Sequence, residues 1–498
     1  MSPAIETGSA GRLANLIPKP VRVESGTGEF QLSETTKIVL DQASSELAAA
    51  GQFLASLLRP PTGLPLEISA GPAAPGDIQL AFLAVDPGLG EEGYELAATP
   101  QSILLQANRP AGLFYALQTL RLLLPAEIEA PEPRPCPWTV PACRIRDTPR
   151  FAWRGVMLDV ARHFHPVADV RRFMGLAAAF KMNRFHLHLS DDQGWRLEIR
   201  SWPDLARKGG STAVSGDPGG YYTQAQYAGL EEYARQRGMI LIPEIDLPGH
   251  TNAALASYPE LNQDGVAPEL YTGTEVGFSS LAIHKGITYR FLEDVIAEIA
   301  ALTSGPYIHI GGDEAQATSH EDYCTFIERA QKIVRAQGKQ AIGWEEIGQA
   351  RLLPGTITQI WNGEKFEHAI RQGGKVIFSL ARKTYIDMKY GPETGLGLVW
   401  AGTISVRDGY NWDPDALLPG VVEKDILGVE TALWSETLCN MRDIEYMAFP
   451  RLIGMAEIGW SRRESRSWEE FRARLAALAP RLREMGVNFY AAPEVDWQ

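Results

Sequence analysis

The feature that most constrains the fold is a strand-then-helix pattern that repeats from about residue 150 onward. Each predicted strand is a short apolar run, as expected for a parallel sheet that is buried on both faces. Helical stripes of apolar residues lie between these runs. The eight predicted strands cover residues 155–160, 184–189, 239–245, 307–310, 340–344, 357–361, 376–380 and 428–433.

Short turns lead into these strands, whereas several segments that leave them are long. Gly238 and Gly305 each fall just before a predicted strand, where a left-handed helix cap can feed a short turn. Residues 194–220, 248–285 and 388–424 form the long segments after strands. This asymmetry predicts an α/β fold, a (β/α)8 TIM barrel whose active face is built from the loops that follow the strands.

A proline-rich stretch, residues 131–141, separates the barrel pattern from the N-terminal part of the chain. Before it, residues 78–83 and 103–106 are predicted strands. Residues 109–124 are a predicted amphipathic helix with Pro110 in its first turn. We therefore expect a smaller α+β domain over residues 1–150 and a catalytic barrel over residues 151–498.

Composition excludes several classes of protein. The chain has 498 residues and a net charge of −14, so nucleic acid and anionic membrane are not expected as partners. No apolar run of about 18 residues predicts a membrane span. The first twenty residues lack a basic start followed by an apolar stretch, so we expect no signal peptide, and a cytoplasmic or a trimmed secreted protein fits equally.

The cysteines show no C-x-x-C spacing and predict neither a zinc site nor a disulfide framework. They are Cys136, Cys143, Cys324 and Cys439.

Polar and aromatic side chains recur at the predicted carboxyl end of every strand. In a barrel these ends meet at one face, so the side chains share a pocket. In chain order they are Arg162 with His163 and His165, Asp191 with Asp192, Asp246 with His250, Asp313 with Glu314, Trp344, Trp361, Tyr385 with Asp387, and Trp434 with Glu436. Their recurrence predicts one active site.

The most informative segment is HIGGDEA, residues 309–315, in which two glycines precede two adjacent carboxylates. Paired carboxylates are typical of glycoside hydrolysis, but a retaining pair normally flanks the sugar at a separation of about 5 Å. Neighbours that leave one strand end are poorly placed to do so. An arrangement with one general acid fits better, in which the second carboxylate positions a 2-acetamido group of the substrate as the nucleophile.

At this point the sequence resembles the β-N-acetylhexosaminidases of glycoside hydrolase family 20, particularly the bacterial ones. The resemblance covers nearly the whole chain and its motifs occur in family order. The matching segments are RPAGLFYALQTLRLLL (109–124), RDTPRFAWRG (146–155), HLHLSDDQGWR (186–196), PEIDLPGH (243–250), HIGGDEA (309–315), TYIDMKY (384–390) and ALWSET (432–437).

The resemblance implies an exo-acting, retaining hydrolase that releases terminal GlcNAc, and also GalNAc, through an oxazolinium intermediate. It implies that Glu314 is the general acid and then the base, and that Asp313 accepts the acetamido N–H. Tyr385 would donate to the acetamido oxygen. The walls of the acetamido pocket would be Trp344, Trp361 and Trp434.

Further substrate-binding roles follow from the same resemblance. Arg162 would bind the 3- and 4-hydroxyls, Glu436 the 4-hydroxyl and Asp387 the 6-hydroxyl. His250 would lie behind Glu314, supported by Asp191 and Asp246. The family's aromatic platform for the next sugar would be Trp400.

No cofactor or metal is implied. The expected partner is a small-molecule or oligosaccharide substrate with a terminal β-linked N-acetylhexosamine. The natural glycan, the linkage and the oligomeric state are not predicted.

Two alternatives come from other classes. His186 and His188 form an H-x-H pattern, which could serve a metal-dependent amidohydrolase with Asp313 or Asp246 as a further ligand. The pair lies inside its strand rather than at its end, which favours hydrogen-bonded core histidines, and His309 is interpreted in the same way. The second alternative is a barrel that binds amino sugars without cleaving them, although such a protein would not need a general acid.

His163 and His165 are interpreted as loop residues near Arg162 rather than as metal ligands.

Overall fold

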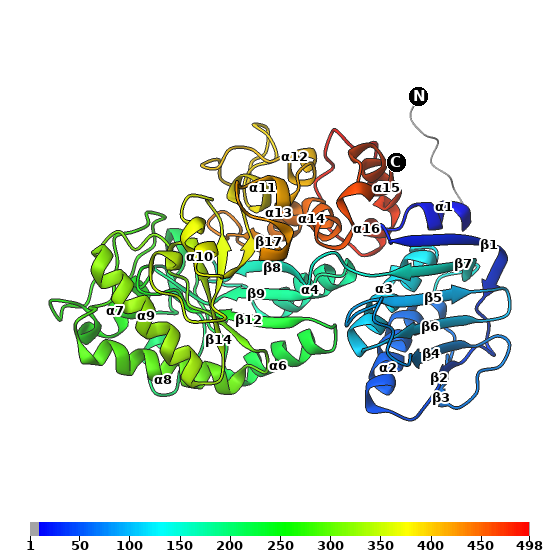
Figure 1. Cartoon of the computed structure of the whole chain (residues 1–498), viewed down its shortest axis with the longest axis horizontal. Coiled ribbons are helices and arrows are strands. Elements are labelled where there is room, and N and C mark those ends of the chain that lie inside the picture. The colour runs from blue at the N-terminus through cyan, green and yellow to red at the C-terminus, as the bar shows by residue number, and fades with distance from the viewer. Residues whose placement is uncertain (1–8, 498) are drawn as a thin grey trace.

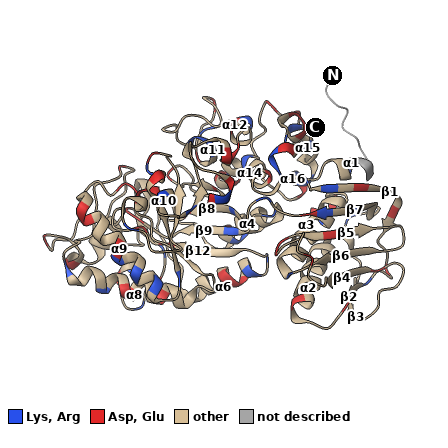
Figure 2. Cartoon of the chain, viewed as in Figure 1, with Lys and Arg blue, Asp and Glu red and all other residues tan. Residues whose placement is uncertain are grey.

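The computed structural model describes residues 9–497, which form a smaller N-terminal domain and a barrel (Figure 1). The barrel strands run away from the N-terminal domain, toward the left of Figure 1. Charged residues of both signs are interspersed along outer helices such as α8, Gly286–Leu302 (Figure 2). Within the described residues, no helix has the length and apolar character needed to cross a membrane.

The N-terminal domain is built on a mixed sheet with the strand order β1-β7-β5-β6-β4-β2-β3. Its strands are β1 Arg22–Gln31, β2 Ile38–Leu40, β3 Ile68–Ala70, β4 Ile78–Phe82, β5 Tyr94–Ala98, β6 Ile103–Ala107 and β7 Thr139–Asp147. The two strands expected here are confirmed as β4 and β6. The expected proline-rich linker was too long, because its last three residues already belong to β7, which pairs antiparallel with β1 and β5.

The main helices of this domain are α2, Ser45–Thr62, and α3, Pro110–Leu123. The Ser44 hydroxyl caps α2 by accepting the Leu47 N–H, and the helix ends at Gly63 in a left-handed conformation. The predicted helix over residues 109–124 is confirmed as α3. It is buried on nearly every side, because it packs on the sheet while Phe114 reaches Gly238 of the barrel.

Eight parallel strands close the barrel, and each coincides with a predicted strand. The order around the barrel follows the chain, with the last strand beside the first. The strands are β8 Trp153–Asp159, β9 Arg184–His188, β12 Ile240–Glu244, β13 Tyr307–His309, β14 Gln340–Trp344, β15 Ile357–Ile360, β16 Lys375–Phe378 and β17 Ile426–Leu433. The predicted TIM barrel preceded by a smaller domain is therefore confirmed.

The other helices differ in length; α1 packs on the N-terminal sheet, and most of the rest lie around the barrel. The longer ones are α4 Val167–Ala179, α6 Gln224–Arg235, α8, α9 His320–Ala336, α14 Arg451–Trp460 and α15 Trp468–Ala477. The shorter ones are α1 Ser9–Ala14, α5 Asp204–Arg207, α7 Asn252–Ser257, α10 Phe366–Arg371, α11 Ala381–Thr384, α12 Val406–Tyr410, α13 Met441–Ala448 and α16 Ala479–Glu484. A small hairpin, β10 Ser190–Asp191 and β11 Gly194–Trp195, directly follows β9.

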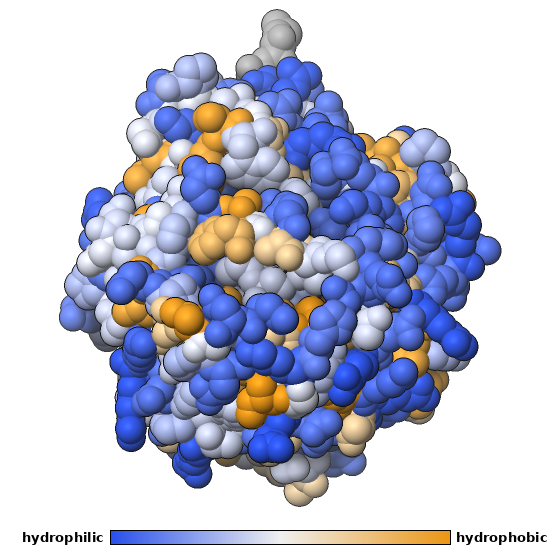
Figure 3. All heavy atoms as spheres, turned by 90° about the vertical axis from the view of Figure 1, so that its left-hand side faces the viewer, coloured by the Kyte–Doolittle hydropathy of each residue, from blue (hydrophilic) through white to orange (hydrophobic). Residues whose placement is uncertain are grey.

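The carboxyl ends of the strands point toward the face drawn in Figure 3, where apolar residues near the centre lie among a mostly hydrophilic surface.

The N-terminal domain contacts the opposite end of the barrel through buried charges. Arg154 at the start of β8 is fully buried, and its Nη1 and Nη2 donate to the Glu92 carboxylate at 2.9 and 3.1 Å. The Asn183 amide donates to the same carboxylate at 2.8 Å. Close by, buried Lys181 pairs with Asp147 of β7 at 3.2 Å. These contacts join the two parts with charge as well as apolar packing.

Glu92→Ala should therefore destabilise the protein strongly, because it leaves the buried Arg154 guanidinium without its counter-charge. We expect a loss of about 3 kcal/mol in the free energy of unfolding, measured as a fall in the denaturant midpoint. Glu91→Ala is the matched control, since Glu91 and its partner Arg109 are both exposed and such pairs contribute little. Equal stability of the two variants would show that the Arg154–Glu92 contact does not join the domains.

Candidate active site

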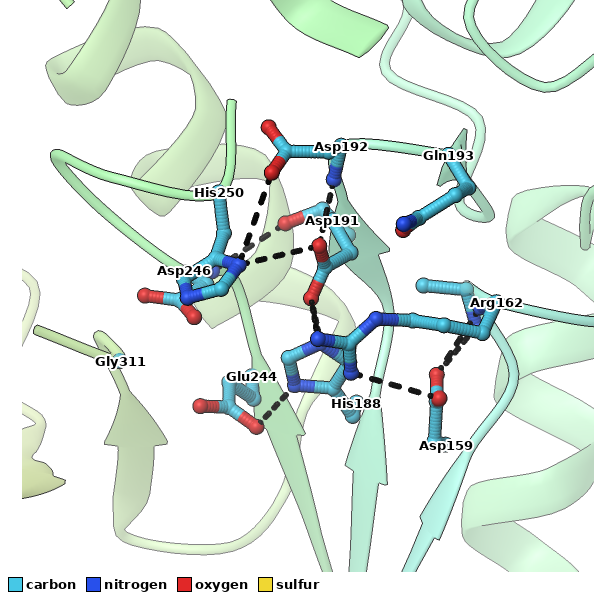
Figure 4. Close-up of polar contacts among 12 residues, drawn as sticks. Asp159, Arg162, His188, Asp191, Asp192, Gln193, Glu244, Asp246, His250 and Gly311 are labelled. Carbon is cyan, nitrogen blue, oxygen red and sulfur yellow. Dashed lines mark hydrogen bonds and ion pairs between the residues drawn. The ribbon is translucent and has the colours of Figure 1, made fainter. Parts of the chain in front are cut away.

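A fully buried carboxylate, Asp191, links three neighbouring segments at the carboxyl end of the barrel (Figure 4). One of its oxygens lies 2.9 Å from Arg162 Nη2 and 2.9 Å from His188 Nε2, and the other lies 3.1 Å from His250 Nδ1. Burial alone would raise the pKa of Asp191, but Arg162 and His250 outweigh it and hold the pKa well below its usual range. Asp191 is therefore a carboxylate anion that contacts Arg162, His188 and His250 at once.

Arg162 is held in place on two sides. Besides Asp191, its guanidinium lies 3.4 Å from Asp159 at the end of β8, and it stacks over the Trp434 ring at 4.8 Å. Burial would lower the pKa of Arg162, but Asp191 and Asp159 hold it well above the usual value. The side chain is thus a fixed, permanent cation at the pocket wall.

The other face of His250 meets the two adjacent carboxylates. His250 Nε2 lies 3.4 Å from Glu314 Oε2 and 3.6 Å from Asp313 Oδ2. Both His250 and Glu314 have a left-handed backbone, with φ of 53° and 46°, which non-glycine residues rarely adopt. Such strain is stored where the surrounding structure enforces a functional geometry.

The backbone conformation explains why two glycines precede the carboxylate pair. Gly311 and Gly312 both have positive φ, and a Cβ at Gly311 would lie 1.7 Å from an Asp246 oxygen. The Gly312 N–H donates to that same oxygen at 3.0 Å. Asp246 therefore lies directly beneath the turn that presents Asp313.

Both of these carboxyl groups have shifted acidities. Burial raises the pKa of Asp246 to about 7. Burial and the charge of Asp246 raise the pKa of Asp313 well above its usual range. Asp313 Oδ1 has no hydrogen-bond partner among the described residues, and a buried oxygen without a partner favours a ligand that can donate to it.

Aromatic rings form a continuous wall beside Asp313. The Trp344 and Trp434 rings lie 5.8 Å apart, and Tyr385 lies 5.9 Å from Trp434. Trp400 lies 5.8 Å from Tyr385 and 6.0 Å from Trp361. Trp344, Tyr385 and Trp434 are buried, Trp361 is half-buried, and Trp400 is 56% exposed at the outer edge. The wall therefore runs from the barrel interior to solvent.

Trp344 is fixed by Glu244, a residue to which the sequence analysis gave no role. The indole N–H donates to Glu244 Oε1 at 2.8 Å, and the same carboxylate pairs with His309 at 2.9 Å and with His188 Nδ1 at 2.5 Å. Burial would raise the pKa of Glu244, but these histidines hold it well below its usual range. The signal was present in the sequence, because Glu244 belongs to the PEIDLPGH segment at the end of β12.

Trp361 is fixed by two further carboxylates that follow β14 and were also missed. The buried Glu345 accepts hydrogen bonds from five consecutive backbone N–H groups, residues 361–365, at 2.8 to 3.2 Å. Glu346 accepts the Trp361 indole N–H at 3.0 Å, and burial together with Asp313 raises its pKa to about 8. Both carboxylates orient the loop that presents the ring.

Two more predicted residues are carboxylates with oxygens that no described residue contacts by a hydrogen bond, the buried Asp387 and the half-buried Glu436. Buried carboxylate oxygens are normally hydrogen-bonded. Within residues 9–497, however, Asp387 Oδ1, Asp387 Oδ2 and Glu436 Oε2 lack hydrogen-bond partners. Burial and Glu436 raise the pKa of Asp387 well above its usual range, and burial also raises that of Glu436. These groups are poised for hydroxyl donors.

The histidines of the H-x-H pattern lie inside the barrel. His186 and His188 are buried, and each has ring nitrogens in contact with carboxylates, Glu430 at 2.8 Å for His186 and Glu244 and Asp191 for His188. His309 is likewise buried against Glu244. The interpretation of these residues as hydrogen-bonded core histidines agrees with these contacts.

The predicted site residues all lie at or after the carboxyl ends of the barrel strands. They are Arg162, Asp191, Asp246, His250, Asp313, Glu314, Trp344, Trp361, Tyr385, Asp387, Trp400, Trp434 and Glu436.

Comparison with known proteins places both domains in one enzyme family. Residues 151–463 match the model of the glycosyl hydrolase family 20 catalytic domain, and residues 13–148 match that of domain 2 of the same family. A beta-N-acetylhexosaminidase of Cellulomonas fimi is 41% identical over 487 residues, which is 97% of each chain.

Solved structures agree. The GH20 beta-N-acetylhexosaminidase of Streptomyces coelicolor A3(2) is 47% identical with a TM-score of 0.94, over 98% of this chain and 99% of that one. The Streptomyces plicatus N-acetyl-beta-hexosaminidase, solved in complex with Thio-NAglucal, is 46% identical with a TM-score of 0.95, over 100% of this chain and 99% of that one. A mutant of the Streptomyces plicatus enzyme is solved in complex with its product, GlcNAc. The chain therefore belongs to glycosyl hydrolase family 20 and is a β-N-acetylhexosaminidase.

Proposed function

We propose that the enzyme releases a terminal β-linked GlcNAc, and also GalNAc, from the non-reducing end of a glycan with retention of configuration, and that the acetamido group of the substrate is the nucleophile. One observation carries this proposal. Two adjacent carboxylates, Asp313 and Glu314, leave one strand end beside a wall of aromatic rings. Such neighbours cannot flank a sugar as the usual retaining pair does.

Each group has a chemical task in this reaction. Glu314 protonates the glycosidic oxygen and then activates water, while His250 contacts it from behind. Asp313 accepts the acetamido N–H and stabilises the positive charge that develops in the oxazolinium ion. Burial and Asp313 raise the pKa of Tyr385, so the phenol stays protonated and donates to the acetamido oxygen. The acetamido methyl group lies against Trp344, Trp361 and Trp434.

The sugar hydroxyls are recognised by the fixed Arg162 guanidinium and by two carboxylates with oxygens that no described residue contacts by a hydrogen bond. Arg162 contacts the 3- and 4-hydroxyls, Glu436 the 4-hydroxyl and Asp387 the 6-hydroxyl, which encloses a single terminal residue. Trp400, exposed at the outer edge of the ring wall, supports the next sugar. The GlcNAc product complex of the Streptomyces plicatus relative supports this assignment of the sugar.

The two alternative functions find less support. A metal-dependent amidohydrolase would need free ring nitrogens on His186 and His188. The His186 nitrogens lie against Glu430 and Glu244 instead, and those of His188 against Glu244 and Asp191. A sugar-binding protein would not need the His250–Glu314 contact.

Initial rates on two aryl β-glycosides test the mechanism. With a chelator present, we expect rapid cleavage of the N-acetylglucosaminide and little cleavage of the glucoside, because only the first carries the nucleophile. Asp313→Ala should lower kcat on the N-acetylglucosaminide by about 10²- to 10³-fold, as loss of a preorganised stabilising group does. Equal rates on the two glycosides, or unchanged turnover in the variant, would mean that the protein supplies its own nucleophile.

Asp246→Asn tests the electrostatic coupling beneath the catalytic pair. Asp313 acts as a carboxylate, so activity rises with pH through its pKa, and the Asp246 charge raises that pKa. The asparagine keeps an oxygen for the Gly312 N–H but removes the charge, so the acid limb of kcat/KM should move to lower pH. Asp322→Asn, at the start of α9, should leave the profile unchanged. A limb that stays in place or moves to higher pH contradicts the coupling.

Glu345→Gln tests whether the loop of residues 361–365 shapes the acetamido pocket. Glutamine offers one acceptor oxygen and turns an amide NH2 toward backbone donors, so Trp361 should lose its fixed position. We expect kcat/KM on the N-acetylglucosaminide to fall by about tenfold, the equivalent of one charge-assisted hydrogen bond. Discrimination against bulkier N-acyl groups should also relax. Glu364→Gln, an exposed residue of the same loop, is the control. Unchanged acyl preference in Glu345→Gln would show that Trp361 is positioned by other contacts.

A further inference from the structure

A second group of polar side chains lies on three separate loops, and one of its members, His163, directly follows Arg162 in the sequence. His163 follows β8, Asp217 lies in the long segment after β9, and Cys439 lies in the loop after β17. His163 Nε2 lies 3.4 Å from Asp217 Oδ2 and 3.6 Å from Cys439 Sγ. The three atoms converge although their residues are far apart in the sequence.

The imidazole of His163 is oriented for this arrangement. Its Nδ1 lies 2.5 Å from the backbone carbonyl of Ser435, and the His163 N–H donates to the Ser435 hydroxyl at 3.0 Å. A carbonyl oxygen only accepts, so the ring proton is on Nδ1 and the lone pair of Nε2 faces Asp217 and Cys439. Metal-binding histidines are typically held in this way, with the second nitrogen donating to a carbonyl.

The spacing fits a tetrahedral metal ion. Zinc bonds of about 2.3 Å to sulfur and about 2.0 Å to nitrogen and oxygen, at tetrahedral angles, place ligand atoms about 3.3 to 3.6 Å apart. The two separations from His163 Nε2, 3.4 Å to Asp217 and 3.6 Å to Cys439, lie in or at the edge of this range, and all three ligand atoms lie within 4.8 Å of one another. The Asp217 side chain is 48% exposed and Cys439 is exposed, so an ion can enter and water can supply the fourth ligand.

Other groups of potential ligands in the described residues are less suited. They lie in the barrel around His186, His188, His250 and Glu244, they contain no thiol, and their atoms are engaged with one another or with Arg162. Cys324 lies 3.7 Å from His320 Nε2, yet that pair belongs to no group of three ligands in the part of the chain that the structure describes. A thiolate, an imidazole and a carboxylate together favour zinc over magnesium or calcium.

We propose that His163, Asp217 and Cys439 bind one zinc-type divalent cation, which braces the three loops beside the sugar pocket. This differs from the sequence-based interpretation, in which His163 was a loop residue and the cysteines predicted no zinc site. Binding replaces the Cys439 thiol proton, which passes to the buffer, so the thiolate sulfur becomes a ligand. The ion takes no part in the proposed hydrolysis. The ion would join the segment that follows Arg162 to the segment that follows Glu436. His163 already contacts the second segment through Ser435.

Titration calorimetry on the chelator-treated, full-length protein with Zn²⁺ tests the site. We expect one ion per chain, with a heat that varies between buffers of different ionisation enthalpy because a thiol proton is released. Co²⁺ should produce a thiolate-to-metal charge-transfer absorption. Zn²⁺ should also raise Tm by a few degrees, since it binds the folded chain preferentially.

Cys439→Ser and Asp217→Asn locate the ion, and Cys324→Ser is the matched control. Cys439→Ser should abolish the Co²⁺ absorption and weaken Zn²⁺ binding by more than the roughly 10- to 100-fold that loss of an outer-shell partner costs. Asp217→Asn should weaken binding less, and Cys324→Ser should match the wild type. Wild-type hydrolysis of the aryl glycoside by Cys439→Ser will show that this variant is folded. The proposal fails if Zn²⁺ binds Cys439→Ser as tightly as wild type, or if millimolar Zn²⁺ gives no heat.

Discussion

The geometry of the site depends on one buried ion, the Asp191 carboxylate. It contacts a guanidinium from the β8 loop, an imidazole inside β9 and an imidazole from the β12 loop, all within 2.9 to 3.1 Å. Taking a carboxylate out of water costs several kcal/mol, and only such a set of partners offsets that cost. Because each partner also faces the sugar pocket or supports a group that does, the requirement to neutralise Asp191 sets the relative positions of three strand ends.

The same principle extends through the barrel interior. Glu244 connects His188, His309 and the Trp344 indole, and Glu430 connects His186 with Trp153 and Gln359. Stability alone does not account for these groups, since replacing a buried ion pair by well-packed hydrophobic residues is often neutral or stabilising. What the polar interior provides is direction, because a hydrogen bond fixes the rotation of an indole or an imidazole where apolar packing leaves alternatives.

The sequence was sufficient for the barrel and for the residues at its strand ends, since apolar runs locate the strands and the fold brings their ends together. It was not sufficient for groups whose role depends on geometry across loops. Glu345 reads as one acidic residue among many, and only the path of residues 361–365 around it reveals five hydrogen bonds. His163, Asp217 and Cys439 share no spacing, so no periodic or motif-based argument could join them.

Carboxylates in this site fall into two groups, and the division explains how a stable barrel can hold a reactive pocket. Asp191 and Glu244 are paired and have lowered pKa values, so they stabilise the fold at neutral pH and lose that contribution as pH falls. Asp313 and Asp387 are buried, Glu436 is half-buried, and all three have raised pKa values and an oxygen without a hydrogen-bond partner among the described residues. A raised pKa means that burial disfavours the charged form, so these groups disfavour the folded state at neutral pH. The N–H and hydroxyl donors of an amino sugar are the groups that would relieve this cost. The paired carboxylates thus contribute stability that offsets the cost of the substrate-facing carboxylates.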